Sequence, residues 1–215
     1  MSTPTSNIKD LNNKLINSKQ KSSYLRIGVT GHRFFAEKER VESGISQALQ
    51  QIARAYPGVP YEVHSSLAEG ADRLVVRLVM KYPGARLVAT LPIEPVEYRE
   101  DFDSVDSCVE FDTMLAQASS VEIVALPPGA SRGDHYAAAG HQIVSETDIL
   151  LAVWDGKPAQ GKGGTAEIVE IARDLGKPVA IVIAGNRRPG TNDPVSLGTK
   201  QGSVVIERLP EPASV

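Results

Sequence analysis

The sequence predicts an α/β protein, with a doubly wound, mostly parallel sheet that is covered by helices on both faces. Short apolar runs of strand length alternate with helical patterns of about 10 to 20 residues along the chain. The runs are apolar almost throughout, which is typical of parallel strands buried on both faces. A chain of 215 residues without an internal repeat or a linker is also compatible with one large domain.

The individual elements follow from apolar periodicity and from the residues that end each segment. The first run, YLRIGVT, ends at Gly31, and the helical pattern that follows it stops at Pro57-Gly58. The second helical pattern ends in the same way at Pro83-Gly84, and the last one ends at Gly176, before Lys177-Pro178. The predicted strands cover 24–30, 61–67, 85–93, 121–127, 148–154 and 178–183, and the pattern at 203–209 fits an edge strand. The predicted helices cover 37–56, 71–82, 106–118, 134–146 and 165–175.

Charge and composition exclude several classes of protein. The net charge is −3, and because the first 21 residues carry +3, the remainder carries −6. A body of that charge makes nucleic acid an unlikely partner, since nucleic-acid-binding proteins usually carry a basic surface. The lone Cys108 cannot form an internal disulfide, and no apolar run approaches the roughly 18 residues of a membrane span. We therefore expect a cytoplasmic protein without a signal peptide, in which a mobile N-terminal arm (1–23) precedes a single domain (24–215).

The loop that precedes the last predicted helix, GKGGTAEIVEIARDLGKP, has the composition of an anion site. Gly163 and Gly164 allow the backbone to approach a ligand, and Thr165 adds a hydroxyl to the free N–H groups of the first helical turn. The alternative is that the glycines form a tight turn and Thr165 only caps the helix. The pattern from Gly156 to Lys162 also begins like a P-loop, but Gly163 stands where that motif requires Ser or Thr. An ATPase or GTPase is therefore disfavoured.

Other strand ends also carry polar residues that could meet a ligand, because ligands of doubly wound sheets bind beyond the carboxyl ends of the strands. Asp155 follows the fifth strand and could accept hydrogen bonds from ribose hydroxyls. Asp72 could instead complement a helix dipole, and the first loop could simply be solvated. No G-x-G-x-x-G pattern is present, so a standard NAD(P) site is not supported. The candidates from the first two strand ends are Gly31, His32, Arg33, Ser66, Gly70, Asp72 and Arg73.

Two further segments leave alternatives open. The charged stretch EYREDF (97–102) could be a lid that carries Tyr98 and Arg99 over a ligand, although a solvated loop is the favoured interpretation. Tyr136 and Gly140 could let a ribose or base approach, or could serve helix packing. The four histidines show no metal-ligand spacing with Cys108 or with paired carboxylates, so no metal site is predicted.

Four segments together resemble the SLOG superfamily, named for the Smf (DNA-processing) and LOG proteins. They are GVTGHR, SSLAEGADRLV, SETDILLAVWDG and GKGGTAEIVEIARDLGKPV, and the resemblance spans roughly residues 24 to 185. SSLAEGADRLV is similar to the S-G-x-A-x-G-x-D segment of the DNA-processing branch, and the last two segments are similar to nucleotide-sensing members and to nucleoside deoxyribosyltransferases. The resemblance implies a modified Rossmann-like fold, a homodimer, and a nucleotide or NAD-derived, ADP-ribose-like ligand. Beyond this nucleotide-type ligand, the sequence predicts no particular cofactor.

The resemblance leaves the activity open between a sensor and an enzyme. LOG enzymes are phosphoribohydrolases that release a base from a nucleoside 5′-monophosphate, and their loop reads P-G-G-x-G-T-x-x-E. When Thr165 is aligned with the threonine of that loop, the glutamate falls on Ile168, and Glu167 lies one residue early. We expect a nucleotide sensor or binding protein. The alternative is an N-glycosidase with Glu167 and Arg73 as candidate catalytic residues, and a DNA-processing role is disfavoured by the acidic body.

Overall fold

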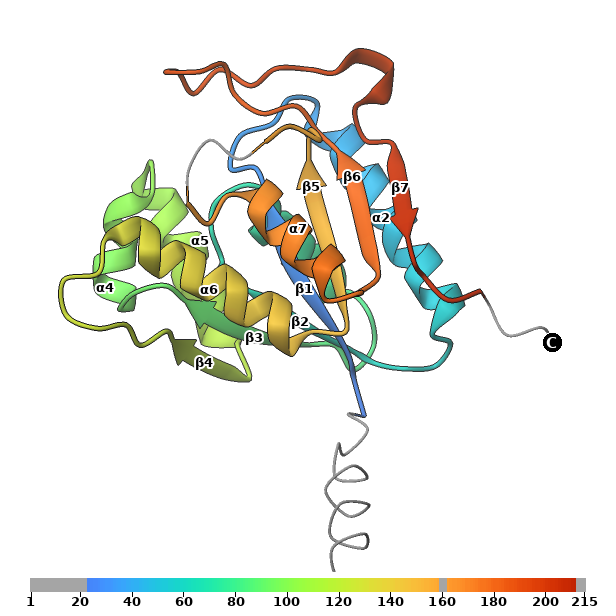
Figure 1. Cartoon of the computed structure of the whole chain (residues 1–215), viewed down its shortest axis with the longest axis horizontal. Helices are drawn as coiled ribbons and strands as arrows, with labels where there is room; N and C mark the ends of the chain where they lie inside the picture. Colours follow the sequence, from blue (N-terminus) through green and yellow to red (C-terminus); the bar gives the residue numbers. More distant parts are fainter. Residues whose placement is uncertain (1–22, 159–161, 212–215) are drawn as a thin grey trace, which may run out of the picture.

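The computed structural model describes residues 23–158 and 162–211, which form one seven-stranded sheet (Figure 1). The strand order is β4-β3-β2-β1-β5-β6-β7, and every neighbouring pair is parallel except β6 with β7. This mostly parallel, Rossmann-like sheet confirms the predicted fold class. The strands are β1 (Leu25–Gly31), β2 (Tyr61–Ser65), β3 (Arg86–Leu91), β4 (Ser120–Ile123), β5 (Ile149–Trp154), β6 (Val179–Ile183) and β7 (Val204–Glu207).

Helices cover both faces of the sheet and divide the apolar core into two parts. Apolar side chains of α2, α3 and α5 pack with one face of the sheet in the larger core, and those of α6 and α7 pack with the other. Figure 1 shows α6 and α7 side by side on the same face. The helices are α2 (Lys38–Ala55), α3 (Ala71–Val79), α4 (Pro95–Tyr98), α5 (Val105–Gln117), α6 (Arg132–Glu146) and α7 (Thr165–Asp174), with short 3-10 helices at Arg99–Asp101 and Gly198–Lys200.

Several predicted element boundaries were wrong by a few residues, for local reasons. Helix α6 begins at Arg132, earlier than predicted, because the Ser131 side chain and the Asp134 carboxylate form a reciprocal capping box. Strand β2 ends at Ser65 because Leu67 adopts a left-handed backbone conformation with φ 57°. The predicted edge strand near the C-terminus is present as β7, and it runs antiparallel to β6.

Residues 97–102, for which a solvated loop was the favoured prediction, are instead an ordered part of the segment between β3 and α5 (the β3–α5 segment, residues 92–104). It contains α4 and a 3-10 turn, and Tyr98 at the end of α4 is only 4% exposed. The Tyr98 ring packs edge-on against Phe102 and Phe111, with centroid distances of 5.0 and 5.7 Å. Arg99, by contrast, pairs with Asp112 of α5 at 2.7 Å. The buried tyrosine ties this segment down across the carboxyl edge of the sheet.

The predicted N-terminal arm falls almost entirely on residues 1–22, which lie outside the described residues, so it stays a prediction. Among the helices of the described part, none is long and apolar enough to cross a membrane.

Candidate functional site

The strand order reverses between β1 and β5, and this reversal opens a crevice at the carboxyl edge of the sheet. The chain leaves β1 toward β2, β3 and β4 on one side, and later continues from β5 toward β6 and β7 on the other. The loops after β1 and β5 therefore turn away from each other and leave space between them. Two cavities occupy this space, and both reach the N-terminus of α7.

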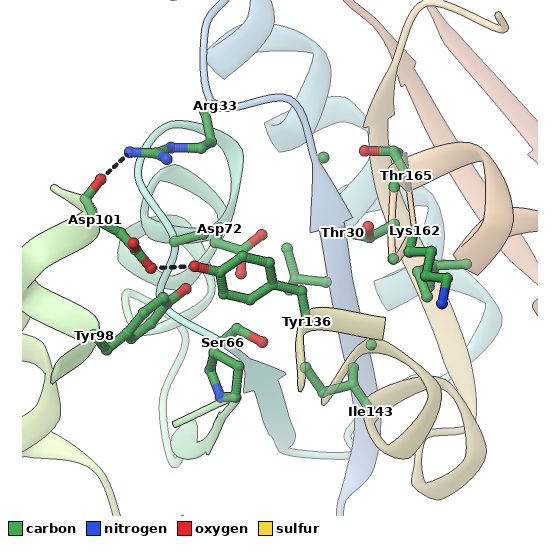
Figure 2. Close-up of a pocket in the computed structure, with 18 of the residues that line it drawn as sticks. Thr30, Arg33, Ser66, Asp72, Tyr98, Asp101, Tyr136, Ile143, Lys162 and Thr165 are labelled. Atoms are coloured by element: carbon green, nitrogen blue, oxygen red, sulfur yellow. Dashed lines mark hydrogen bonds between the residues drawn. The ribbon is translucent and has the colours of Figure 1, made fainter. Parts of the chain in front are cut away.

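The first cavity has a volume of about 280 Å³ and lies between β1, the β3–α5 segment, α6 and α7 (Figure 2). That volume is close to the lower end of typical small-molecule pockets, roughly 300 Å³. Three aromatic rings, from Tyr98, Phe102 and Tyr136, form part of its wall. Its other lining residues are Val29, Thr30, Gly31, Arg33, Ser66, Ala68, Asp72, Pro92, Asp101, Gly140, Ile143, Lys162, Gly163, Gly164, Thr165 and Ile168.

Asp101 fastens the β3–α5 segment over this cavity. Its carboxylate accepts hydrogen bonds from the Tyr136 hydroxyl and from Arg132 Nε, the latter at 2.9 Å. Its backbone carbonyl accepts from Arg33 Nη2 at 2.8 Å, as Figure 2 shows. One residue therefore joins the segment to α6 and to the loop after β1.

Asp72 is a buried carboxyl group that lines the same cavity. The Ser65 hydroxyl donates to its Oδ2 at 2.9 Å, and the backbone N–H groups of Ser66 and Ala68 also donate to the carboxylate. Burial raises the pKa of Asp72 to about 6 even though these hydrogen bonds favour the charged form. Asp72 consequently shapes the loop after β2 and presents to the cavity a carboxyl group that titrates close to neutral pH.

The second cavity, of about 370 Å³, lies on the other side of the α7 N-terminus and is more polar. His32 and Asp155 face each other in its wall, and the Asp155 backbone N–H donates to His32 Nε2 at 3.2 Å. Burial lowers the pKa of His32, and the Asp155 carboxylate, whose Oδ1 lies 3.3 Å from the same nitrogen, opposes this shift. The Asp155 carboxylate accepts from the Lys157 backbone N–H at 3.1 Å. Trp154, Asn186 and Arg187 complete the wall.

The N-terminus of α7 lies where the two cavities meet, and it has the groups needed to hold an anion. Within the described part of the chain, no acceptor bonds the Thr165 hydroxyl or the backbone N–H groups of Thr165 and Ala166. Lys162 borders both cavities and pairs with Asp134 at 2.9 Å. Free N–H groups at the positive end of a helix dipole attract phosphate.

Gly163 makes this loop geometry possible. Its φ is +70°, a conformation that strains other residues, and a Cβ there would lie 2.6 Å from the backbone nitrogen of Ala137. Only a glycine lets the loop cross the α6 backbone so closely.

Glu167, the predicted catalytic acid, lies outside both cavities. Its Oε2 accepts from the Gly163 backbone N–H at 2.8 Å, and its Oε1 lies 3.0 Å from His141 Nε2. The hydrogen bond from the Gly163 backbone is the main cause of a lowered pKa of Glu167, and the His141 contact adds to it. Both contacts keep the carboxylate ionised. The position that aligns with the LOG glutamate is Ile168, whose side chain lines the first cavity. The geometry gives Glu167 a part in holding the glycine loop.

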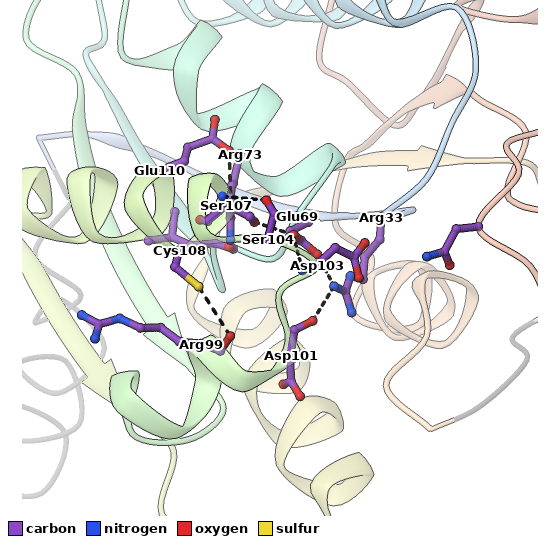
Figure 3. A network of polar contacts seen from close by, with 12 residues as sticks. Arg33, Glu69, Arg73, Arg99, Asp101, Asp103, Ser104, Ser107, Cys108 and Glu110 are labelled. Atoms are coloured by element: carbon purple, nitrogen blue, oxygen red, sulfur yellow. Dashed lines mark hydrogen bonds and ion pairs between the residues drawn. The ribbon is translucent and has the colours of Figure 1, made fainter.

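Arg73, the other predicted catalytic residue, is also absent from these two cavities. Its guanidinium donates to the Ser107 carbonyl at 2.8 Å (Figure 3). It also donates to the Leu67 carbonyl at 2.9 Å, and its carbon lies 4.4 Å from the centre of the Phe102 ring. Gly70, predicted to bind ligand, precedes α3 and lies with Arg73 at a third cavity.

The remaining predicted binding residues lie at the crevice. Gly31, Arg33, Gly164 and Thr165 border both cavities, and each of the others borders one of them. Asp101 and Phe102 lie in the stretch 97–102 that was considered as a lid, but neither was predicted to be a site residue, and Arg187 was not considered. Their proximity to α7 arises from long-range contacts that the local sequence does not indicate.

Comparisons with known proteins support the fold and leave the family open. No protein family matches the chain, and no curated protein is similar to it in sequence. A structure of DNA processing protein A from Helicobacter pylori, a protein that binds single-stranded DNA, superposes on this chain with a TM-score of 0.51. The two sequences are 15% identical, and the superposition covers 79% of this chain and 68% of that chain. The molybdenum cofactor carrier protein from Chlamydomonas reinhardtii superposes with a TM-score of 0.40 and 16% identity, over 73% and 74% of the two chains. The chain thus has a Rossmann-like fold similar to that of DNA processing protein A.

Proposed function

We propose that this protein binds a nucleotide or NAD-derived ligand, with its phosphates at the N-terminus of α7 and its two ends in the two cavities. The observation that carries the proposal is that both cavities meet at this helix end and share Gly31, Arg33, Lys162, Gly164 and Thr165. A ligand with a central anionic group and two uncharged ends matches this arrangement. The resemblance to SLOG proteins supports the same ligand class.

The two cavities differ in the way that the two ends of such a ligand differ. The first one presents aromatic rings together with Ile143 and Ile168, which suit the flat, weakly polar face of a nucleobase. The second one presents Asp155, Asn186 and Arg187, which suit the hydroxyl groups of a ribose or a second nucleotide half. The ligand class that satisfies both is ADP-ribose-like.

Thermal unfolding against AMP, ADP, ATP, NAD and ADP-ribose tests this proposal. A ligand at about 100 times its dissociation constant adds roughly 2.7 kcal/mol to the free energy of unfolding. For a chain of this size, that corresponds to a rise of several degrees in Tm. If none of the five compounds raises Tm, the proposed ligand class is wrong.

The substitution Thr165→Val tests where the phosphates bind. The Thr165 hydroxyl has no partner in the described part of the chain, so the change leaves Tm of the free protein near the wild-type value. Loss of a charge-assisted hydrogen bond lowers ligand affinity about tenfold. Thr113→Val, on the exposed side of α5, is the matched control and leaves affinity unchanged. Equal affinities for the two variants would place the phosphates elsewhere.

A second candidate function is cleavage of an N-glycosidic bond in the same ligand. It is favoured by Asp72, because a cavity carboxyl with a pKa of about 6 has the properties of a general acid. Each ligand mixture is therefore assayed for free base. If base release survives in Glu167→Gln and is lost in Asp72→Asn, the general acid is Asp72. If release is lost in Glu167→Gln and survives in Asp72→Asn, the general acid is Glu167. If the wild type releases no base, the protein binds the ligand without cleaving it.

Single-stranded nucleic acid is tested as a further ligand. The net negative charge of the chain predicts that nucleic acid is an unlikely partner, yet Arg33, Lys38 and Arg77 lie near Phe34 around the third cavity of the protein. A single-stranded oligonucleotide is therefore titrated at low and moderate salt. Binding that weakens steeply with salt would assign a single-strand site to the surface around this cavity.

The homodimer and the cytoplasmic location also stay predictions. Sedimentation of the purified chain with and without ligand decides the first. Fluorescence microscopy of a tagged chain decides the second.

A further inference from the structure

A third cavity, of about 270 Å³, opens beside the loop after β1, away from the N-terminus of α7. Its walls come from the loop after β1 and from the first residue of α2, together with α3 and α5. It shares Arg33 with both of the other cavities and Phe34 with the second one. Its lining residues are Arg33, Phe34, Phe35, Lys38, Gly70, Arg73, Arg77, Glu110 and Pro194.

The charges around this cavity are unbalanced. Four cationic side chains, Arg33, Lys38, Arg73 and Arg77, line the cavity, and Glu110 is the carboxylate among its lining residues. Glu110 already pairs with two of them, at 3.2 Å from Arg73 Nη1 and in closer contact with Arg77 Nη1. Arg33 is paired with Glu69, which lies outside the cavity lining. Two carboxylates thus oppose four cations, and the remaining excess of two positive charges favours an anion.

Two of the cations have donors that no group in the described part of the chain uses. Arg73 is 1% exposed, and among residues 23–158 and 162–211 its buried Nη2 finds no hydrogen-bond partner. The Lys38 side chain forms no hydrogen bond or ion pair with these residues either. A buried guanidinium nitrogen without an acceptor is rare, because desolvation of a charged donor is costly.

The guanidinium of Arg73 is held in place before any ligand arrives. Its Nη1 donates to the backbone carbonyl of Ser107 (Figure 3). Its Nε donates to the backbone carbonyl of Leu67, and Phe102 covers one face of the group. Arg33 is similarly held by Glu69, which also accepts from the Asp103 backbone N–H at 3.0 Å and from the Ser107 hydroxyl. Donors fixed in this way lose little freedom when they bind an anion.

We propose that this cavity is a second anion site, separate from the one at α7, for a compact polyanion of the pyrophosphate class. Guanidinium groups bind phosphate oxygens in pairs, and several cations around a small volume favour a multiply charged group over a single carboxylate. The polyanion is either free or the diphosphate part of a larger molecule.

Calorimetric titration of the full-length chain with inorganic pyrophosphate tests the site. Lys38→Gln raises the dissociation constant about tenfold, as expected for a lost charge-assisted contact. Arg54→Gln removes one positive charge from the last turn of the same helix, far from the cavity, and changes the constant less than twofold. Arg77→Gln weakens pyrophosphate binding in the same direction as Lys38→Gln.

The competing explanation is that pyrophosphate binds only at the N-terminus of α7. Affinity that falls in Lys162→Gln and is unchanged in Lys38→Gln would overturn the proposal, as would the absence of binding at millimolar pyrophosphate. Pyrophosphate binding that depends on Lys38 supports it even if no nucleotide binds, so the two proposals can fail separately. A parallel titration with ADP shows whether the polyanion is free or part of a nucleotide. If ADP binds more tightly than pyrophosphate and its binding also depends on Lys38, the ligand is a nucleoside diphosphate.

Discussion

The glycine loop before α7 offers a direct test of the site geometry, through the substitution Gly163→Ala. Gly163 has a φ of +70°, and a Cβ added there would lie 2.6 and 2.8 Å from the nitrogen and Cα of Ala137. Gly156 lies in the same β5–α7 connection with a φ of +78°, but nothing lies within 4 Å of its added Cβ. The pair therefore separates backbone strain from steric contact with α6.

The expected magnitudes follow from these two contributions. Alanine in the left-handed region costs roughly 1–2 kcal/mol, which is the whole effect expected for Gly156→Ala. Gly163→Ala bears the same cost plus a backbone overlap of the kind that typically adds about 1–3 kcal/mol. With about 2–4 °C per kcal/mol for a chain of this length, Tm falls by about 2–8 °C in the control and by about 4–20 °C in Gly163→Ala.

Urea and thermal unfolding of the two variants measure this difference. Binding of the ligand found in the nucleotide panel provides a second measurement, because displacement of the loop moves the N–H groups of α7. Gly156→Ala is expected to keep ligand affinity, and Gly163→Ala is expected to lose it. Equal losses of stability, with equal ligand affinity, would refute the argument that the loop crosses α6 in close contact.

Two further predictions concern the first cavity. Burial raises the pKa of Asp72 to about 6 from the unfolded value of 3.8, so the folded state binds more protons in this interval and loses stability as pH rises through it. Relative to the wild type, Asp72→Asn therefore gains roughly 3 kcal/mol in free energy of unfolding between about pH 4 and pH 7, and a pH-independent difference in urea unfolding would contradict the raised pKa. Tyr136→Phe removes the hydroxyl that donates to Asp101 and destabilises the fold by about 1 kcal/mol. Tyr82→Phe, whose hydroxyl has no recorded hydrogen bond in the described part of the chain, has almost no effect on Tm; equal Tm values for the two variants would contradict a stabilising role for the Asp101 contact.

Local pattern was sufficient to predict most of the fold. Each apolar run and each helical periodicity is a short-range property, and Gly or Pro marks where it ends, so the parallel α/β class could be predicted without coordinates. Boundaries were less certain because they depend on caps such as Ser131 with Asp134, whose effect is a small free energy. Residues 97–102 were wrongly predicted to be a solvated loop because four of the six residues in EYREDF are charged, although the fold buries the tyrosine among them.

For the candidate site, the sequence determined which loops carry polar and glycine residues, because those loops follow strands whose carboxyl ends lie at one edge. Only the tertiary structure decided which of these residues meet. Arg73 and Asp72 are neighbours in sequence, yet one borders the third cavity and the other borders the first. Adjacent residues on a helix point about 100° apart, and what each one reaches depends on the elements packed around it. The same geometry turns Glu167 toward His141 and places Ile168 in the cavity wall.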